Sequence, residues 1–351
     1  MTTEKGSEFS CPLPLSDYPE IVMAHGGGGA LTQRLFEEIF QPAFSNPFLN
    51  ARHDGAVVEL SGNRLAFTTD SYVVRPHTFP GGDIGRLAVS GTVNDLLMCG
   101  AQPMFISLGL IIEEGFPVAS LRTVIDSIRA EAKDANVSVI TGDTKVVDKG
   151  KGDGIFINTS GIGVLDANTD IAPQRVRPGD AVILSGDIGR HGVAVMAARE
   201  MLDLGESIES DVASLGGPVR ALFEGSISIH CLRDPTRGGL ATALVEIADS
   251  AGVEISIDET AIPVSERVRG VCEILGLDPL YVANEGRFVA FVPEPQADEA
   301  IDILRRDPLS ATACIIGTVK ESEPGIVTCT TSIGGTRVID MLSGEQLPRI
   351  C

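Results

Sequence analysis

The sequence predicts an α/β (α+β) protein built from two mixed domains. The chain has 351 residues, which suits two domains of about 150 residues each. In both halves, short apolar runs of strand length alternate with longer segments whose apolar residues have helical spacing. A turn-forming stretch at 173–180, which ends in Pro-Gly-Asp, separates the two halves.

The first 50 residues are predicted to form an arm and a glycine-rich segment. Residues 1–20 are polar and proline-containing, which is typical of a loose arm at a chain end. Residues 25–29 read His-Gly-Gly-Gly-Gly, and the apolar residues that follow at 31–39 have helical spacing. This pattern predicts a glycine-rich loop that leads into a helix.

Residues 51–172 are expected to form the N-terminal domain. A Ser-Gly-Asn turn between two apolar runs indicates a β-hairpin at 57–69. Helical spacing predicts a helix at 84–99, ended by Gly100, and a second helix at 118–135. The other expected strands, of which the first reads as buried, are 105–112, 137–141 and 155–165.

Residues 173–340 are expected to form the C-terminal domain, again with both helices and strands. The expected helices are 191–204, 240–251 and 297–306. The expected strands are 181–185, 253–257, 288–292, 315–319 and 326–330. Residues 341–351 have no clear periodic pattern of apolar residues and contain a proline. They are predicted to form a flexible tail that ends in Cys351.

Composition excludes several classes of function. A formal net charge of −21 argues against nucleic acid and against an anionic membrane surface as partners. The chain has no apolar run of membrane-spanning length and no apolar signal core at its start, so a cytoplasmic protein is the expectation. Seven scattered cysteines without a CxxC pair indicate reduced thiols. A phosphate ligand here requires a metal ion and backbone amides.

Three aspartates are candidate metal ligands. Asp70 and Asp143 each follow a predicted strand, and strand ends in α/β sheets are where ligands collect. Asp95 lies inside the helix at 84–99, next to Asn94 and among apolar residues. Carboxylate and amide oxygens suit Mg²⁺, which also binds substrate phosphates. The alternative is three independent capping or turn aspartates.

Two loops are candidate ligand sites. Backbone amides of the loop at 25–29, including Gly27 and Gly28, could bind phosphate before the helix, or the loop could be a flexible joint. The segment 233–239, Arg-Asp-Pro-Thr-Arg-Gly-Gly, opens the helix at 240–251. Its Asp234 either binds a ligand or simply caps that helix.

Three further side chains have possible chemical roles. Lys145 follows Asp143 by two residues, so both face one side if the strand continues. Lys145 and Glu285 could act as general acid or base, although a surface charge is the simpler interpretation for each. Cys351 places a thiol at the very end of the chain, where it is either a nucleophile on a mobile tail or a chance terminal residue.

Taken together, five motifs resemble the family of the hydrogenase maturation protein HypE. They are Thr-Thr-Asp-Ser-Tyr-Val-Val at 68–74, Gly-Thr-Val-Asn-Asp at 91–95, Thr-Gly-Asp-Thr-Lys-Val-Val at 141–147, Asp-Pro-Thr-Arg-Gly-Gly at 234–239 and Pro-Arg-Ile-Cys at 348–351. The resemblance covers about 25–351 and extends to the superfamily of aminoimidazole ribonucleotide synthetase, selenophosphate synthetase and thiamine-monophosphate kinase. The terminal Pro-Arg-Ile-Cys motif is specific to the HypE family.

The resemblance implies an activity, cofactors and partners. It implies a homodimer that pairs the sheets of its first domains and binds ATP and Mg²⁺ near the interface. A carbamoyltransferase, HypF, places a carboxamide on Cys351, and ATP-dependent dehydration converts this group to a thiocyanate. The cyano group then passes to iron on a HypC–HypD scaffold, as a ligand for the nickel-iron hydrogenase centre.

The resemblance also implies roles for individual residues. Cys351 carries the substrate, Glu285 is the base, and Lys145 orients the carboxamide. The metal ligands are Asp70, Asp95 and Asp143. The cofactor-binding residues are Gly27, Gly28, Asp70, Asn94, Asp95, Asp143, Thr144 and Asp234.

Two other classes of function stay open on the sequence alone. A kinase or synthetase of the same superfamily that acts on a free small molecule does not need Cys351. A non-catalytic acidic interaction protein does not turn over ATP and does not need three aspartates at one site.

Overall fold

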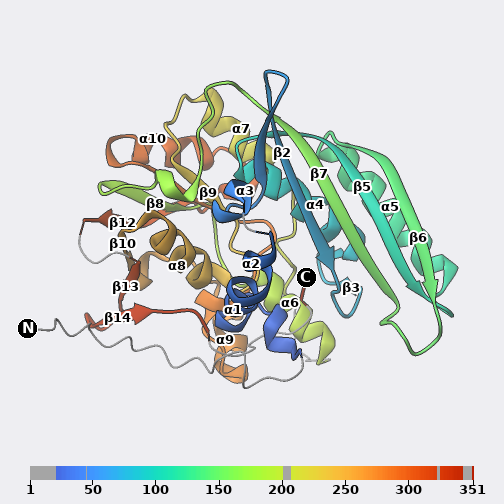
Figure 1. Ribbon diagram of the computed structural model, residues 1–351. Helices are drawn as coiled ribbons and strands as arrows, with labels where there is room; N and C mark the ends of the chain where they lie inside the picture. The colour runs from blue at the N-terminus through green and yellow to red at the C-terminus, as the bar shows by residue number, and fades with distance from the viewer. Residues whose placement is uncertain (1–20, 45, 201–206, 322–324, 343–349) are drawn as a thin grey trace, which may run out of the picture.

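The computed structural model describes residues 21–44, 46–200, 207–321, 325–342 and 350–351. The predicted arm at 1–20 and most of the predicted tail, residues 343–349, lie outside these ranges. The polypeptide forms two mixed α/β halves that lie side by side (Figure 1). Within the described residues, no helix combines the length and the apolar character that crossing a membrane requires.

Short helical elements precede the first sheet, as the glycine-rich pattern predicts. They are η2 (Met23–Gly26), α1 (Ala30–Leu35), a π-helical turn η3 (Phe36–Phe40), α2 (Gln41–Phe44) and α3 (Pro47–Asn50). The carboxamide oxygen of Asn46 accepts hydrogen bonds from the first amides of α3, which explains where that helix begins.

The N-terminal half contains a five-stranded sheet in the order β1-β2-β7-β5-β6. The strands are β1 (Ala56–Leu60), β2 (Asn63–Tyr72), β5 (Gln102–Glu113), β6 (Ser138–Val147) and β7 (Ile155–Leu165). A small hairpin of β3 (Thr78–Phe79) and β4 (Gly82–Asp83) leads into the first long helix. Only β5 and β6 pair in parallel, and the other neighbours in this sheet are antiparallel.

Two helices, α4 (Ile84–Met98) and α5 (Val118–Asp134), lie on one face of this sheet (Figure 1). Thirteen of the fifteen residues of α4 are buried, because the helix packs between the sheet and the C-terminal half. An aspartate on such a helix must find a partner, since an unpaired buried charge is very costly.

The other face of the sheet is open. Phe67, Ile162 and Phe105 are paired across three neighbouring strands, and each is at least 37% exposed. Ile111 lies on the same face of β5 and is 45% exposed. The expectation of a buried strand at 105–112 is therefore wrong for one of its two faces, because none of the described elements covers it.

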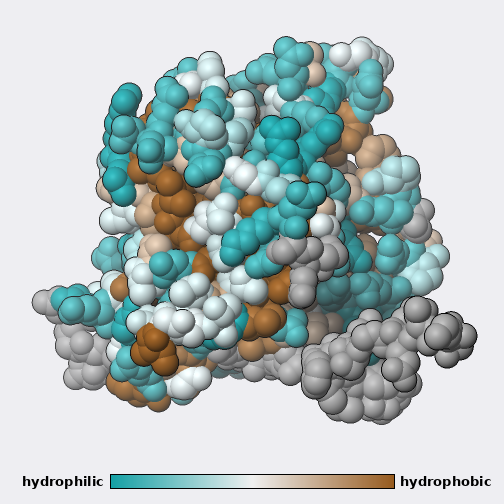
Figure 2. Space-filling model, turned by 90° about the vertical axis from the view of Figure 1, so that its left-hand side faces the viewer, coloured by the Kyte–Doolittle hydropathy of each residue, from teal (hydrophilic) through white to brown (hydrophobic). Residues whose placement is uncertain are grey.

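The C-terminal half contains a seven-stranded sheet in the order β14-β13-β10-β12-β8-β11-β9. Its strands are β8 (Asp180–Leu184), β9 (Cys231–Arg233), β10 (Glu254–Asp258), β11 (Val289–Pro293), β12 (Cys314–Lys320), β13 (Ile326–Thr330) and β14 (Thr336–Ile339). Its helices are α6 (Arg190–Arg199), α7 (Gly216–Glu224), α8 (Gly239–Ala251), α9 (Glu266–Leu275) and α10 (Glu294–Leu304). Hydrophilic residues cover most of this side of the molecule, with hydrophobic residues in small groups between them (Figure 2).

A single core cluster joins the two halves. It includes Leu87 and Val93 from α4, Ile183 from β8 and Phe288 beside β11. The loops that follow β9 and precede β11 therefore stand against α4, at the junction of the two sheets. This junction is where the candidate active site lies.

Candidate active site

Three carboxylates meet at this junction. Asp54 precedes β1, Asp95 lies on α4, and Asp234 follows β9. Each offers one oxygen, and these oxygens lie within 4.8 Å of one another. The guanidinium Nε of Arg233 lies 2.9 Å from Asp54, and the hydroxyl of Thr68 donates to Asp95 at 2.8 Å. We call these three residues the aspartate cluster.

Three full negative charges in the aspartate cluster repel one another, which costs free energy. Burial raises the pKa of Asp95 well above its usual range, and the charges of Asp234 and Asp70 raise it further. Burial and the charge of Asp54 raise the pKa of Asp234 to about 8. Such a site relieves its repulsion by holding protons or by binding a cation. Asp95 and Asp234 were predicted as site residues, whereas Asp54 was not.

Asp70 lies beside the aspartate cluster, on β2. The structure corrects the sequence here, because β2 does not end at Asp70 but continues to Tyr72. Strand alternation therefore places Thr68, Asp70 and Tyr72 on the face covered by α4. Arg237 lies 3.3 Å from the Asp70 carboxylate, and both residues line the same pocket as Cys351.

A small pocket of about 180 Å³ connects these groups. It is lined by the aspartate cluster and by Thr68, Thr69, Asp70, Gly91, Thr236, Arg237, Glu285 and Cys351. The structure thus brings together five of the predicted site residues, from five separate parts of the sequence: Asp70, Asp95, Asp234, Glu285 and Cys351.

Glu285 is buried in this pocket and is only 4% exposed. Within the described residues, its Oε1 atom has no hydrogen-bond partner. Burial raises the pKa of Glu285 well above its usual range, the charges of Asp234, Asp70 and Asp211 raise it further, and Arg237 opposes the shift. A buried carboxyl with a raised pKa and a free oxygen is suited to accept a proton near neutral pH.

Cys351 lies inside the pocket, with 9% of its surface exposed. The Val73 amide donates to the Cys351 carbonyl oxygen at 3.0 Å, and the Ile350 side chain is buried in the core. Burial raises the pKa of the Cys351 thiol to about 12, although Arg237 opposes the shift. In this pose the sulfur is therefore a protonated thiol.

Asp143, Thr144 and Lys145 lie elsewhere in this chain. The expectation that Asp143 ends a strand is wrong, because β6 continues to Val147, where it forms the edge of the sheet. Asp143 and Lys145 are 70% exposed and form an ion pair of 2.7 Å with each other. Strand register puts them on the open face of the sheet, whereas Asp70 is on the covered face.

Asn94 does not face the aspartate cluster. Its amide nitrogen donates to the Ala213 carbonyl at 3.0 Å, and its amide oxygen accepts from the Leu215 amide at 2.9 Å. The same nitrogen lies 3.4 Å from the Glu285 carbonyl. Asn94 therefore supports the site by fixing backbone segments, and its side chain is not available to a metal ion.

The glycine-rich loop borders the site. Gly28 has a φ of +78°, and an added Cβ would lie 2.9 Å from the Arg237 carbonyl oxygen, so no larger residue fits. The first helical amide, of Ala30, donates to the Leu342 carbonyl at 2.9 Å. Gly28 also lines a second cavity, of about 590 Å³, together with Asp54 and Thr68, whereas Gly27 is not among the residues that line it.

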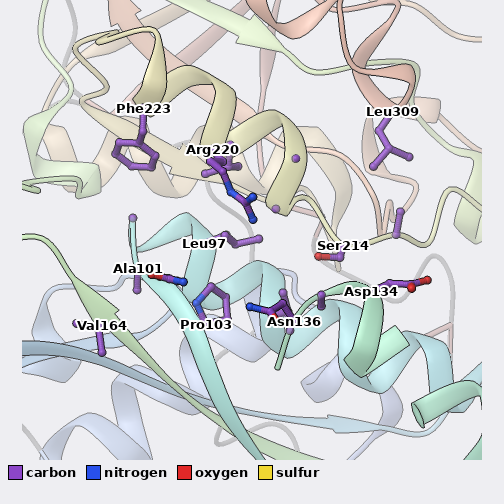
Figure 3. Close-up of a pocket in the computed structure, with 18 of the residues that line it drawn as sticks. Leu97, Ala101, Pro103, Asp134, Asn136, Val164, Ser214, Arg220, Phe223 and Leu309 are labelled. Carbon is purple, nitrogen blue, oxygen red and sulfur yellow. The ribbon is translucent and has the colours of Figure 1, made fainter. Parts of the chain in front are cut away.

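A larger cavity, of about 710 Å³, lies away from this site. It is formed between α7, which supplies Arg220 and Phe223, and the N-terminal half, which supplies Leu97, Pro103 and Asn136 (Figure 3). It contains none of the residues predicted to act in catalysis or cofactor binding. Size alone therefore does not identify the functional site.

Comparison with known families first defines the class. The AIR synthase related protein models match twice, with the N-terminal domain at residues 52–165 and the C-terminal domain at 177–330. The two domains, and the fold that they form, are thus those of an AIR synthase related protein.

Closer relatives define the family. The carbamoyl dehydratase HypE of Azotobacter vinelandii is 49% identical over 94% of this chain and 97% of its own length. A crystal structure of a HypE–HypF complex matches with a TM-score of 0.83 and 47% identity, covering 88% of this chain and 99% of that chain. A crystal structure of HypE in complex with ATP matches with a TM-score of 0.80 and 46% identity, over 93% and 98%. The chain belongs to the HypE family.

Proposed function

We propose that this protein is an ATP-dependent carbamoyl dehydratase that acts on its own C-terminus. It converts an S-carboxamide on Cys351 to a thiocyanate, which supplies the cyano ligand of nickel-iron hydrogenase. The observation that carries the proposal is the position of the Cys351 thiol, in one pocket with Glu285 and the aspartate cluster. A chain of the HypE family is expected to use such a site for this reaction.

The reaction balances without a further reagent. The carboxamide oxygen attacks the γ-phosphorus of ATP, and ADP leaves. Phosphorylation makes the oxygen a good leaving group and makes the nitrogen more acidic. Glu285 accepts a proton from this nitrogen, and loss of the second nitrogen proton and of phosphate gives S–C≡N. The products are the thiocyanate, ADP and inorganic phosphate.

The docked thiol acts as a carrier and not as a nucleophile. Its high pKa keeps it protonated in the pocket, and a protonated thiol attacks poorly. Carbamoylation by a HypF partner therefore takes place on the undocked tail, and docking follows. Dehydration therefore takes place while Cys351 lies buried in the pocket.

A nucleotide fits the space next to this pocket. The 590 Å³ cavity shares Asp54, Thr68 and Thr69 with the small pocket, so base and ribose in the cavity place the phosphates at the aspartate cluster. The carboxylates of Asp54, Asp95 and Asp234, with Asp70 nearby, would hold Mg²⁺, which would supply charge neutralisation for the transferred phosphoryl group. The raised pKa values of Asp95 and Asp234 support a cation at this place.

Asp143 and Lys145 act from a second copy of the chain. The open face of the five-stranded sheet carries these two residues beside exposed Phe67, Phe105 and Ile111. An apolar face of this kind is costly in water and favours pairing with another sheet. In the resulting homodimer, the Asp143–Lys145 pair approaches the site of the partner, where Lys145 orients the carboxamide, whereas Thr144 lies on the opposite face of β6.

Partners and location follow from the chemistry. HypF donates the carbamoyl group to Cys351, and a HypC–HypD complex that carries iron accepts the cyano group. We place the reaction in the cytoplasm, since the six cysteines within the described residues are all free thiols.

Mass spectrometry of the C-terminal peptide tests the proposed function. The protein is incubated with carbamoyl phosphate, ATP, Mg²⁺ and the HypF partner, and the peptide is then analysed. Before dehydration, we expect the C-terminal peptide to carry a carbamoyl group. After dehydration, we expect a peptide that is lighter than the carbamoylated one by the mass of one water. A carbamoylated peptide that never loses water in the presence of ATP contradicts the proposal, and ATP consumption with a free small molecule favours a superfamily kinase instead.

Substitution of the aspartate cluster is expected to remove metal-dependent nucleotide binding. Asp95→Asn and Asp234→Asn each remove one carboxylate charge at the metal, so calorimetry should detect a large loss of Mg-ATP affinity. In the wild type, affinity should rise as the pH increases toward about 8, because Mg²⁺ competes with the proton on Asp234. Asp126→Asn, at an exposed helix position, is the matched control. Unchanged Mg-ATP binding in both cluster variants is incompatible with this site.

Charge on the open sheet face is expected to separate the dimer. Phe105→Asp puts an unpaired charge into the proposed interface, which should weaken the dimer by at least roughly 100-fold, since an unpaired buried charge costs more than the about 1–3 kcal/mol of an unpaired neutral polar group. Light scattering across a dilution series measures this. Ile333→Asp, at a residue that is 94% exposed in the C-terminal half, is the control and should leave the dimer intact. A Phe105→Asp protein that stays dimeric at the same concentrations places the interface elsewhere.

A further inference from the structure

The last two residues of the chain are held by a contact outside the reacting groups. The ring nitrogen Nε2 of His191, on α6, donates a hydrogen bond of 2.5 Å to the carbonyl oxygen of Ile350. This carbonyl belongs to the peptide bond directly before Cys351. His191 is completely buried, and its ring packs edge-on against Phe79 with a centroid distance of 5.4 Å.

A neighbouring hydroxyl sets the orientation and the tautomer of His191. The Ser210 hydroxyl oxygen accepts the Val212 amide at 3.1 Å, so its hydrogen is free to bond the Nδ1 atom of His191 at 2.8 Å. Nδ1 is then an acceptor, and Nε2 carries the hydrogen that the Ile350 carbonyl receives. Burial lowers the pKa of His191, which keeps the imidazole neutral in this arrangement.

The same segment that orients His191 also holds the base. Next to Ser210, the Asp211 carboxylate accepts hydrogen bonds from the amides of Glu285 at 3.2 Å and Gly286 at 3.0 Å. An added Cβ at Gly286 would lie 1.8 Å from the Asp211 carbonyl oxygen, so the two segments approach as closely as only glycine allows. The positions of the tail and of the base are therefore set by one short stretch of backbone.

We propose that His191, oriented by Ser210, is a positioning residue that docks the C-terminal tail by binding the peptide carbonyl next to Cys351. It touches none of the reacting atoms. It raises the fraction of time for which the carboxamide lies beside Glu285, and such intramolecular placement contributes directly to rate. The inference rests on the proposed function for its effect on catalysis, but the docking contact itself can be measured independently.

Two variants separate docking from folding. His191→Leu removes the donor, whereas His191→Gln retains an amide donor at about the position of Nε2. His230→Leu is the matched control, because His230 is a partly buried histidine that binds Asp180 and Arg177 away from the pocket. All three are compared with the wild type in the full-length protein.

The first readout is the alkylation of Cys351 by iodoacetamide, followed on the C-terminal peptide by mass spectrometry. Loss of one hydrogen bond should increase this rate about tenfold in His191→Leu, and His191→Gln should recover much of the protection. The second readout is single-turnover dehydration of carbamoylated protein at saturating ATP. It should slow about tenfold in His191→Leu, while ATP affinity and carbamoylation by HypF stay unchanged.

The outcomes distinguish the two proposals. Wild-type alkylation and dehydration rates in His191→Leu overturn the docking role, as does an equal effect of His230→Leu, which indicates general destabilisation. If the wild type forms no thiocyanate, the proposed function fails. The alkylation rates then still decide whether His191 docks the tail.

Discussion

Replacement of Cys351 by alanine abolishes thiocyanate formation. The sulfur is the atom to which the carboxamide is bonded, so no other side chain in the pocket can replace it. The fold should be retained, because the residue lies at the end of the chain and alanine fills part of the same apolar space. Mass spectrometry of the C-terminal peptide measures product, and calorimetry measures Mg-ATP binding, which should stay close to that of the wild type.

Cys329→Ala is the control for the loss of a buried thiol. Cys329 is completely buried on β13 in the C-terminal sheet. β13 lies near one edge of this sheet, whereas β9, which precedes Asp234 of the pocket, forms the other edge. This variant should lose some stability but retain dehydration. Thiocyanate formation in Cys351→Ala at any substantial rate contradicts the proposal that Cys351 carries the carboxamide. It leaves a superfamily kinase that acts on a free molecule as the better interpretation.

Replacement of Glu285 by glutamine stalls the reaction between carbamoylation and dehydration. Glutamine retains the shape of the side chain but cannot accept a proton from the carboxamide nitrogen. Loss of a general base typically slows a reaction by about 10²–10⁴-fold. The variant should therefore accept a carbamoyl group on Cys351 and bind Mg-ATP, and rapid-quench sampling should detect slow conversion to thiocyanate.

Glu131→Gln is the matched control for Glu285→Gln. Glu131 is also a buried glutamate, but it binds Arg86 and the Ser90 hydroxyl and does not line the pocket. Dehydration at the wild-type rate in Glu285→Gln means that another group is the base. Loss of both ATP binding and carbamoyl acceptance in Glu285→Gln means that the residue is structural.

Much of the fold could be predicted from the sequence because local patterns are strong. The hairpin at 57–69 and the helix at 84–99 correspond to β1–β2 and α4 within a few residues. No pattern in the sequence predicts α7, α9, β9 or β14. Two of these, β9 and β14, have three and four residues, which is too short for a periodic signal.

The candidate site was predicted in part. Asp95, Asp234, Glu285 and Cys351 converge, whereas Asp143 does not join them within one chain. The error has a physical origin: both Asp70 and Asp143 were taken to follow strands, but both strands continue, and residue alternation places the two carboxylates on opposite faces.

Two other parts of the site had little or no signal in the sequence. Asp54 precedes a hairpin, and nothing local separates it from an ordinary turn aspartate. Arg237 was visible only as part of the 233–239 loop. Its place in one pocket with Asp70 and Cys351 depends on contacts between residues 114 or more positions apart, which periodicity cannot report.

The burial of Cys351 also bears on the survival of the protein in an oxidising environment. Peroxides attack thiolates that they can reach, and overoxidation to sulfinic or sulfonic acid is in general irreversible. In the pocket the sulfur is both protonated and shielded, with 9% of the residue exposed. Each time the tail leaves the pocket to bind a partner protein, the thiol loses this protection. The working lifetime of one molecule is then limited by the time that its substrate-bearing atom spends outside the pocket, and oxidative inactivation should be fastest under conditions that favour the undocked tail.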